Sequence, residues 1–281
     1  MGAKSVKRII SLILSVLLCA AMVPAAFAGR EDLIFRDARS DFSEEFSNSR
    51  ITDAQAFGED KIAALTDNGV LWQYNRDSGD FEKVAEDVAA FGGSYYALAY
   101  IKEDGSLWID DEDVEPADGV VSETENGYRK VMEDVVSLSY DRDTGFAVDK
   151  DGKAWFWGDA VSEMWVPFNY EDIPSSYTKT GVWGTSVVEP YNFLDNVKQI
   201  LRHGATYILT SDGDLYAVGD NINCALGIGN EDQTYYSKEP LFVTDNVEEI
   251  LCSGDHNFVI KTDGSLWGWG TIEVRVDGFN S

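Results

Sequence analysis

Residues 259–267 read Val-Ile-Lys-Thr-Asp-Gly-Ser-Leu-Trp, and the same pattern of residue types recurs at 64–72, 100–108, 147–155 and 208–216. Every copy has Asp or Asn followed by Gly, an aromatic residue three positions later, and an aliphatic residue four positions before the Gly. Asn-Gly and Asp-Gly favour turns that need positive φ, and apolar residues flank each turn. Each copy is therefore predicted to be a β-hairpin that buries its aromatic residue against a neighbour. The ten structural repeat positions are Gly69, Trp72, Gly105, Trp108, Gly152, Trp155, Gly213, Tyr216, Gly264 and Trp267.

The spacing of the hairpins indicates how they assemble. The turn glycines are 36, 47, 61 and 51 residues apart, which fits four short strands per repeat. A second landmark, Asp-Val or Asn-Val, precedes each hairpin from the second onward, at 87–88, 134–135, 196–197 and 246–247. A single hairpin is marginally stable in water, so the repeats must stack to share a core. The sequence predicts an all-β fold, a β-propeller of four-stranded blades over residues 51–281.

These residues resemble the repeat of the regulator-of-chromosome-condensation family, which forms β-propellers. The fifth copy matches that repeat closely, and the fourth carries its Gly- and Asn-rich tail over 219–229, with Cys224 where the family has Gly and Ala225 where it has Gln. The third keeps Trp157-Gly158, whereas the first two copies lack this pair. The matching residues of the fifth copy are Val247, Ile250, Gly254, His256, Asp263, Gly264, Trp267, Trp269 and Gly270.

The resemblance implies a rigid disc that presents loops to a partner, and little more about function. Some members of the family are nuclear exchange factors for a small GTPase and bind chromatin. Others are secreted bacterial propellers, and one similar class inhibits β-lactamase by covering its active site. The chain looks like a secreted bacterial member, for the reasons that follow.

The N-terminus indicates export. Lys4, Lys7 and Arg8 precede an apolar run, and small residues follow it up to Ala28, as in a secretory signal peptide. The apolar run is shorter than the roughly 20 residues that a membrane span needs. We predict a signal peptide at 1–28, an N-terminal arm at 29–50, and a secreted or cell-surface protein with no membrane insertion after cleavage.

Charge excludes one class of partner. Residues 29–281 hold 50 acidic and 19 basic residues, since the three basic residues of 1–28 have no acidic counterpart. Binding through phosphates needs clustered Lys and Arg, so we expect no nucleic-acid partner. The same excess of acid argues against adsorption to an anionic membrane.

Five hairpins are fewer than the seven blades common in the family. The chain forms either a five-bladed ring or a partial propeller. The first unit lacks the strand that we expect at the start of each later unit, such as residues 81–84 before the second and 241–243 before the fifth. The alternating segment 272–276 is a candidate strand that pairs with the first unit and closes the ring.

Two features have two interpretations each. Cys224 and Cys252 are the two cysteines of the mature chain, and they form either a disulfide, which export permits, or two free buried thiols. The acidic connection 109–127 is either a site for a hard cation or a solvated run of charge, and its spacing matches no EF-hand loop. We commit to no metal site and no cofactor.

The insertion at 159–193 is unusually aromatic for a connection. Aromatic residues are efficient anchors for a partner, but they also pack beneath loops as a satellite core. The candidate partner-binding residues here and after Gly229 are Trp165, Phe168, Tyr170, Tyr177, Trp183, Tyr235 and Tyr236.

Catalysis has little support in the sequence. The chain has two histidines, His203 and His256, and no G-x-S-x-G, H-E-x-x-H or phosphate-binding loop. We therefore predict a non-catalytic propeller that binds an extracellular or surface protein. The alternatives are a carbohydrate- or envelope-binding propeller that uses the same aromatic residues, and an enzyme with no assignable catalytic residue.

Overall fold

The structure is a computed structural model that describes residues 44–57, 61–93, 97–110, 114–141, 144–159, 166–168, 172–181, 184–253 and 256–270. Among these residues, no helix is long and apolar enough to cross a bilayer. The proposed signal peptide at 1–28, most of the N-terminal arm and the candidate closing strand at 272–276 lie outside the described residues.

The described chain folds into five antiparallel sheets, which we call blades 1 to 5 in chain order. Blade 1 consists of β1 (Ile51–Phe57), β2 (Lys61–Thr66), β3 (Leu71–Asn75) and β4 (Asp80–Ala85). Blade 2 consists of β5 (Val88–Gly93), β6 (Leu98–Lys102), β7 (Leu107–Ile109), β9 (Tyr128–Met132) and β8 (Thr124–Glu125). Blade 3 consists of β10 (Val135–Asp141), β11 (Thr144–Asp149), β12 (Ala154–Asp159), β14 (Gly184–Leu194) and β13 (Thr178–Gly181).

Blade 4 consists of β15 (Val197–His203), β16 (Ala205–Thr210), β17 (Leu215–Asp220) and β18 (Tyr236–Thr244). Blade 5 consists of β19 (Val247–Ser253), β20 (His256–Lys261) and β21 (Leu266–Gly270). The described residues also include three short helical segments: α2 (Glu44–Ser47), η4 (Ser175–Tyr177) and η5 (Ile222–Cys224).

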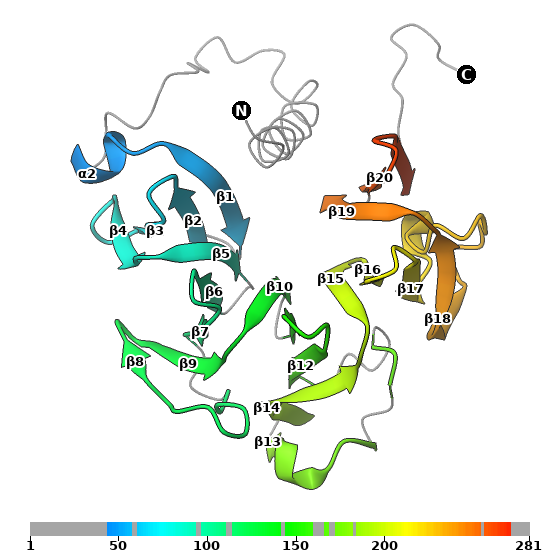
Figure 1. The fold of residues 1–281 in the computed structure, drawn as a ribbon, viewed down its shortest axis with the longest axis horizontal. Coiled ribbons are helices and arrows are strands. Elements are labelled where there is room, and N and C mark those ends of the chain that lie inside the picture. The colour runs from blue at the N-terminus through cyan, green and yellow to red at the C-terminus, as the bar shows by residue number, and fades with distance from the viewer. Residues whose placement is uncertain are drawn as a thin grey trace, which may run out of the picture.

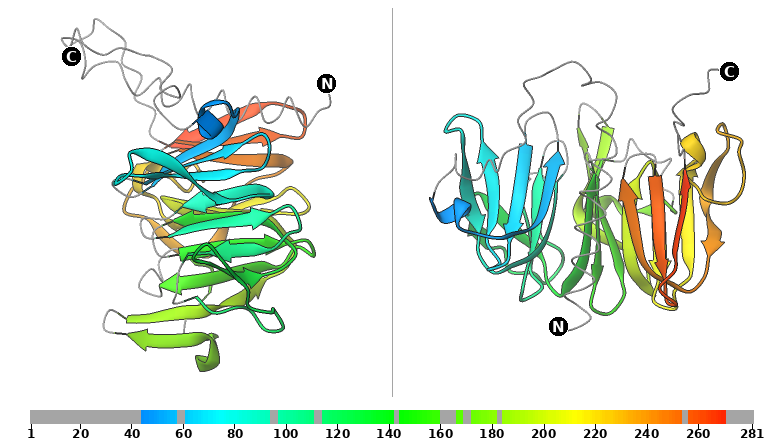
Figure 2. Two further views of the ribbon diagram at one scale, coloured as in Figure 1. Left: turned by 90° about the vertical axis from the view of Figure 1, so that its left-hand side faces the viewer. Right: turned by 90° about the horizontal axis from the view of Figure 1, so that it is seen from above.

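The five sheets are arranged in a ring with the first strand of each nearest the centre (Figure 1). Seen edge-on, the strands run across the thickness of the disc (Figure 2). The predicted all-β propeller is confirmed, and the described residues form five blades. Blades 2 and 3 each have five strands instead of the predicted four, and blade 5 has three described strands.

One strand assignment from the sequence is wrong. Residues 81–84 and 241–243 do not open the next unit, because β4 pairs with β3 and β18 pairs with β17. They are the outermost strands of blades 1 and 4. The next blade begins only at the Asp-Val or Asn-Val landmark, where the chain returns to the centre of the ring.

Each Asp-Gly or Asn-Gly turn has the predicted left-handed glycine. In blade 1, the Gly69 amide donates to the Thr66 carbonyl at 3.0 Å, the Thr66 amide donates to the Val70 carbonyl at 3.0 Å, and Gly69 has φ of 77°. The loop therefore has three residues, and only the glycine adopts positive φ. Residues with a side chain adopt positive φ less easily than glycine does.

The Asp-Val and Asn-Val landmark connects successive blades. Asp87, Asp134, Asn196 and Asn246 all have positive φ, which Asp and Asn tolerate better than most residues. The following valine amide donates to the turn glycine of the preceding blade at 2.8 to 2.9 Å, in the pairs Val88–Gly69, Val135–Gly105, Val197–Gly152 and Val247–Gly213. Both sequence landmarks thus meet at every one of these four junctions.

The fifth junction, between blades 5 and 1, differs. A Cβ built on Gly69, Gly105, Gly152 or Gly213 meets atoms of the next blade at 3.2 to 3.6 Å, whereas one built on Gly264 meets nothing within 4 Å. Leu71, Leu107 and Leu215 are fully buried, but Leu266, at the same repeat position, is 53% exposed. Within the described residues, blade 5 therefore presents an uncovered face.

The helix α2 covers the face of blade 1 that points away from blade 2 and carries Trp72. The sequence analysis assigned no helix to these residues. Phe46 is 1% exposed, stacks on Phe81 at 4.2 Å and contacts Trp72 edge-on at 5.6 Å. The last part of the N-terminal arm therefore caps the first blade with a phenylalanine.

Candidate functional site

The order of strands gives the disc two different faces. At each of the four bonded junctions, the start of an inner strand meets the turn of the preceding blade, so all these turns lie on one side, the turn face. The third strands β3, β7, β12 and β17 run away from that side and end at the other, the loop face. The long connections from third to fourth strands all leave from the loop face.

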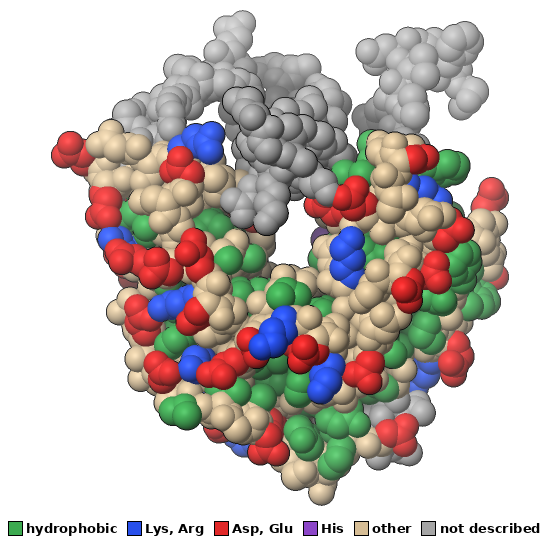
Figure 3. Space-filling model, viewed as in Figure 1, with side chains coloured by type: hydrophobic (Ala, Val, Ile, Leu, Met, Phe, Trp, Pro, Cys, Tyr) green, Lys and Arg blue, Asp and Glu red, His purple; other side chains and the backbone are tan. Residues whose placement is uncertain are grey.

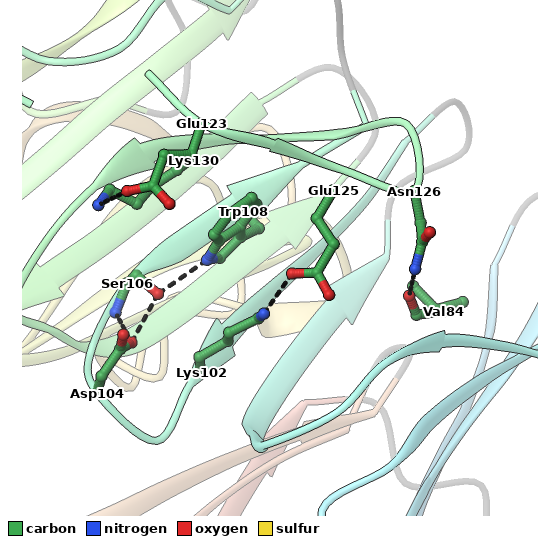
Figure 4. Close-up of polar contacts among 9 residues, drawn as sticks. All are labelled: Val84, Lys102, Asp104, Ser106, Trp108, Glu123, Glu125, Asn126 and Lys130. Carbon is green, nitrogen blue, oxygen red and sulfur yellow. Dashed lines mark hydrogen bonds and ion pairs between the residues drawn. The ribbon is translucent and has the colours of Figure 1, made fainter. Parts of the chain in front are cut away.

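The connection of blade 2 is folded onto β9 by ion pairs. Its carboxylates are the counter-ions of basic residues on the sheet, as in Lys102–Glu125 at 2.5 Å and Lys130–Glu123 at 2.8 Å (Figure 4). Arg129 pairs with Glu115 at 3.1 Å and also donates to the Val114 carbonyl. The predicted solvated run of charge is therefore partly a set of structural ion pairs.

The same region shows how a repeat aromatic is held. The Asp104 carboxylate accepts hydrogen bonds from the Ser106 amide at 2.8 Å and hydroxyl at 2.6 Å, and Ser106 Oγ accepts from Trp108 Nε1 at 2.8 Å (Figure 4). The Lys102 ammonium lies 4.8 Å from the centre of the Trp108 ring. These hydrogen bonds hold the pKa of Asp104 below its usual value. Asn126 Nδ2 donates to the Val84 carbonyl of blade 1 at 3.1 Å, which ties the β8–β9 turn to the preceding blade.

The described part of the aromatic insertion packs against blade 3. Phe168 contacts Phe156 at 5.2 Å and Phe193 at 5.0 Å, and Tyr177 contacts Tyr191 edge-on at 5.4 Å. Both Phe168 and Tyr177 are half-buried. These contacts agree with the satellite-core interpretation for these two residues. Trp165, Tyr170 and Trp183 lie outside the described residues.

A cavity of about 490 Å³ opens beside this packing, on the outer edge of blade 3. Its lining comes from the insertion and from the end of β14 with the turn that follows. The lining residues are Phe168, Asp172, Ile173, Tyr191, Asn192, Phe193, Leu194 and Asp195. The cavity thus combines aromatic and aliphatic walls with two carboxylates and one amide.

The connection of blade 4 is organised by Asn221, whose importance the sequence analysis missed. Asn221 is fully buried; its Nδ2 donates to the carbonyls of Asn230 at 2.6 Å and Asp232 at 3.1 Å, and its Oδ1 accepts from the Leu226 amide at 3.1 Å. This loop presents Ile222 with 58% of its surface exposed. The sequence showed only the Gly- and Asn-rich tail over 219–229, and the structure identified Asn221 as the residue that holds this loop.

Tyr235 and Tyr236 end this connection and begin β18. Both are half-buried, and Tyr235 packs against the core between blades 4 and 5. Because β17 and β12 both end at the loop face, Tyr235 and Tyr236 lie on the same side of the disc as the insertion.

The connections of blades 2 and 3 meet. The Glu115 amide donates to the Val188 carbonyl of β14, and Asp118 lies close enough to Glu189 to affect its titration. Burial first, and then the Asp118 and Glu115 carboxylates, raise the pKa of Glu189 above its usual value. Acidic side chains are also spread over every blade on the face shown in Figure 3. The junction of blades 2 and 3 is therefore negatively charged.

Among the described residues, no group of three His, Cys, Asp or Glu side chains is placed to hold a metal ion. Cys224 and Cys252 are free thiols in the structure, not a disulfide. They lie on different blades, Cys224 in η5 and Cys252 in β19. Burial raises the pKa of the Cys252 thiol to about 12.

Known proteins of similar structure are β-propellers, in agreement with the fold described above. No protein-family model matches the chain. A curated relative, Protein pim1 of Schizosaccharomyces pombe, is 24% identical over 156 residues, which are 50% of this chain and 28% of that protein. The chain thus spans less than a third of this relative.

Solved structures of similar fold include Saccharomyces cerevisiae Prp20p, with TM-score 0.55, 15% identity and coverage of 80% of this chain and 57% of that chain. A complex of Kap60 with yeast RCC1 (Prp20) has TM-score 0.56 and 17% identity, and the match covers 81% of this chain and 58% of that chain. Human WBSCR16 has TM-score 0.58 and 16% identity, and the match covers 81% of this chain and 63% of that chain. Prp20p was described together with its binding to Gsp1p and histones. The predicted resemblance to regulator-of-chromosome-condensation propellers is confirmed at the level of the fold, and the chain spans about three-fifths of these neighbours.

Proposed function

We propose that the chain is a secreted, non-catalytic β-propeller that binds a protein partner through its loop face. The observation that carries this proposal is the difference between the two faces. The turn face uses the same short turn in every blade, and the turn glycines of blades 1 to 4 accept the bonds between blades. The loop face carries connections of different length and composition on a rigid scaffold, which is where proteins place binding residues.

The chemistry of the loop face indicates the kind of partner. It combines the acidic junction of blades 2 and 3 with an apolar side chain, Ile222, on a loop that Asn221 holds in place. An exposed apolar residue on a rigid loop loses little entropy on binding and is a typical anchor. The solved neighbours support the choice of a protein partner, since Prp20p binds Kap60, and its binding to Gsp1p and histones was described. We expect the partner of this chain to be a basic extracellular or surface protein.

The test uses residues 29–281 as bait against secreted and surface proteins, followed by binding measurements with the purified partner. We expect Ile222→Ser to weaken binding about tenfold, within the range of a single interface anchor. Val136→Ser is the matched control, because Val136 is 61% exposed and lies where β10 begins, at the turn face. The triple variant with Trp165, Tyr177 and Trp183 replaced by Ala tests the insertion in the same assay.

Two further results separate the proposal from its alternatives. Association with a basic partner should slow as salt increases, because exposed charges are screened beyond about 8 Å at physiological ionic strength. Equal effects of Ile222→Ser and Val136→Ser would show that the loop face does not bind the partner. Saturable binding on a glycan panel, without any protein partner, would favour the carbohydrate-binding alternative.

A further inference from the structure

We infer that the cavity on blade 3 is a recognition pocket for a cationic side chain, best suited to arginine, of the basic partner. This inference rests on the proposed function and specifies the chemistry that one part of the molecule recognises. Its starting point is the mixed lining of the cavity, in which Asp172 and Asp195 lie among aromatic residues and none of the described lining residues is Lys or Arg.

The polar side chains of the cavity mostly accept hydrogen bonds. Asn192 Nδ2 already donates to the carbonyls of Ala154 at 3.0 Å and Leu194 at 3.3 Å, which leaves its amide oxygen as the free acceptor. Asp172 and Asp195 add carboxylate oxygens. Apart from the Tyr191 hydroxyl, which both donates and accepts, these side chains offer only acceptors. A ligand with many donors and a positive charge matches this set.

The walls favour the same kind of ligand. Tyr191, Phe193 and Phe168 line the cavity, and the faces of aromatic rings attract cations. Phe193 and Phe168 are fixed by their mutual contact at 5.0 Å, and Tyr191 by its contact with Tyr177 at 5.4 Å, so the walls are ordered before a ligand arrives. A guanidinium stacks on an aromatic ring and still directs five N–H donors toward carboxylates, whereas an ammonium has three.

The surroundings extend the negative charge of the cavity. Glu189 lies on β14 two residues before Tyr191, and its carboxylate is close to those of Asp118 and Glu115 at the loop face. The cavity lies toward the turn-face end of β14, because Asn192 donates to the Ala154 carbonyl beside the Gly152 turn. A basic segment that extends from the loop face along the outer edge of blade 3, past Glu189, can therefore place an arginine in the cavity. Opposite charge across such a contact mainly provides specificity and a faster association.

In the test, residues 29–281 are titrated with the peptide acetyl-Gly-Arg-Gly-amide, and binding is measured by isothermal titration calorimetry or NMR. The matched peptides replace Arg with Lys or with Gln. We expect saturable binding in the order Arg, Lys, Gln, with no detectable binding of the Gln peptide. Asp172→Asn and Asp195→Asn should each weaken binding of the Arg peptide about tenfold, because a charge-assisted hydrogen bond is replaced by a neutral one.

The control variant is Asp77→Asn, which removes one exposed carboxylate from the β3–β4 connection of blade 1, away from the cavity. It should leave peptide binding unchanged, and thermal unfolding of all three variants checks that they fold. Equal binding of the Arg and Gln peptides, or unchanged binding in both cavity variants, would overturn the inference. Saturation by a simple methyl glycoside with no response to the Arg peptide would also overturn it.

The two proposals fail in different ways. If the Arg peptide binds as expected but no protein partner responds to Ile222→Ser, the cavity inference stands and the proposed loop-face function fails. If a partner is lost in Ile222→Ser but retained in Asp172→Asn and Asp195→Asn, the function stands and the cavity inference fails.

Discussion

Trp108 and Trp267 occupy the same position of the same repeat, and we expect their replacement by Ala to have very different costs. Both lie in the sequence Asp-Gly-Ser-Leu-Trp. In both hairpins the serine hydroxyl accepts from the indole N–H, at 2.8 Å in blade 2 and 2.9 Å in blade 5, and a lysine ammonium lies near the ring, at 4.8 Å and 5.2 Å. The local contacts are thus nearly identical.

Burial separates the two residues. Trp108 is 5% exposed because blade 1 covers it. Trp267 lies opposite Val259 on the face of blade 5 that points toward blade 4, and it is 60% exposed because no described fourth strand lies beside β21. A fully buried Trp removes about 200 Å² from water, which at about 25 cal/mol per Å² is about 5 kcal/mol. For Trp267, less than half of that area is buried, which gives about 2 kcal/mol.

The measurement is urea-induced unfolding of residues 29–281 carrying Trp108→Ala or Trp267→Ala. We expect Trp108→Ala to lower the free energy of unfolding by about 3–5 kcal/mol and Trp267→Ala by about 1–2 kcal/mol. Blades are stacked repeats, so hydrogen exchange of β20 and β21 checks whether blade 5 unfolds separately. Equal losses for the two variants would refute the reasoning, because they would mean that the Trp267 side chain is buried in solution.

Three further predictions test other parts of the structure. The folded-state pKa of Asp104 is below its unfolded value, so its carboxylate stabilises the fold above the unfolded pKa. This contribution is lost as the pH falls through the folded pKa. Asp104→Asn should therefore lower the free energy of unfolding at pH 7, and its difference from the unmodified chain in urea unfolding should shrink near pH 3. The Cys252 thiol, with its pKa raised to about 12, should react slowly with Ellman's reagent at pH 8, and two thiols should titrate after denaturation of residues 29–281; a count of zero would mean a disulfide. A Cβ on Gly145 would lie 2.0 Å from Trp157, whereas one on Gly92 has its nearest neighbour at 3.6 Å. In urea unfolding, Gly145→Ala should therefore lower the free energy of unfolding by at least about 2 kcal/mol and Gly92→Ala by less than about 1 kcal/mol. Similar values for the two variants would contradict the packing at Trp157.

The candidate site was only partly predictable. Its aromatic content and its position on a long connection were visible in the sequence, and the structure gives Phe168 a place in the wall of a cavity. Asp172 and Asp195 were not singled out, because an isolated Asp in so acidic a chain carries no signal of its own. Tyr177 was predicted as an anchor, yet it packs half-buried against Tyr191, and only the fold brings those two residues together.

The sequence by itself determined the repeated unit, because the Asp-Gly or Asn-Gly turn, the aromatic after it and the Asp-Val or Asn-Val landmark act through local backbone preferences that residues nearby in the chain specify. It also determined the excess of acidic charge. Only the tertiary structure decided which strand belongs to which blade, that Phe46 covers blade 1 while Leu266 and Trp267 stay exposed on blade 5, and that the connections of blades 2 and 3 meet beside a cavity. These features depend on contacts between residues far apart in the chain. The sequence pattern within one repeat does not specify whether a neighbouring segment will cover its side chains.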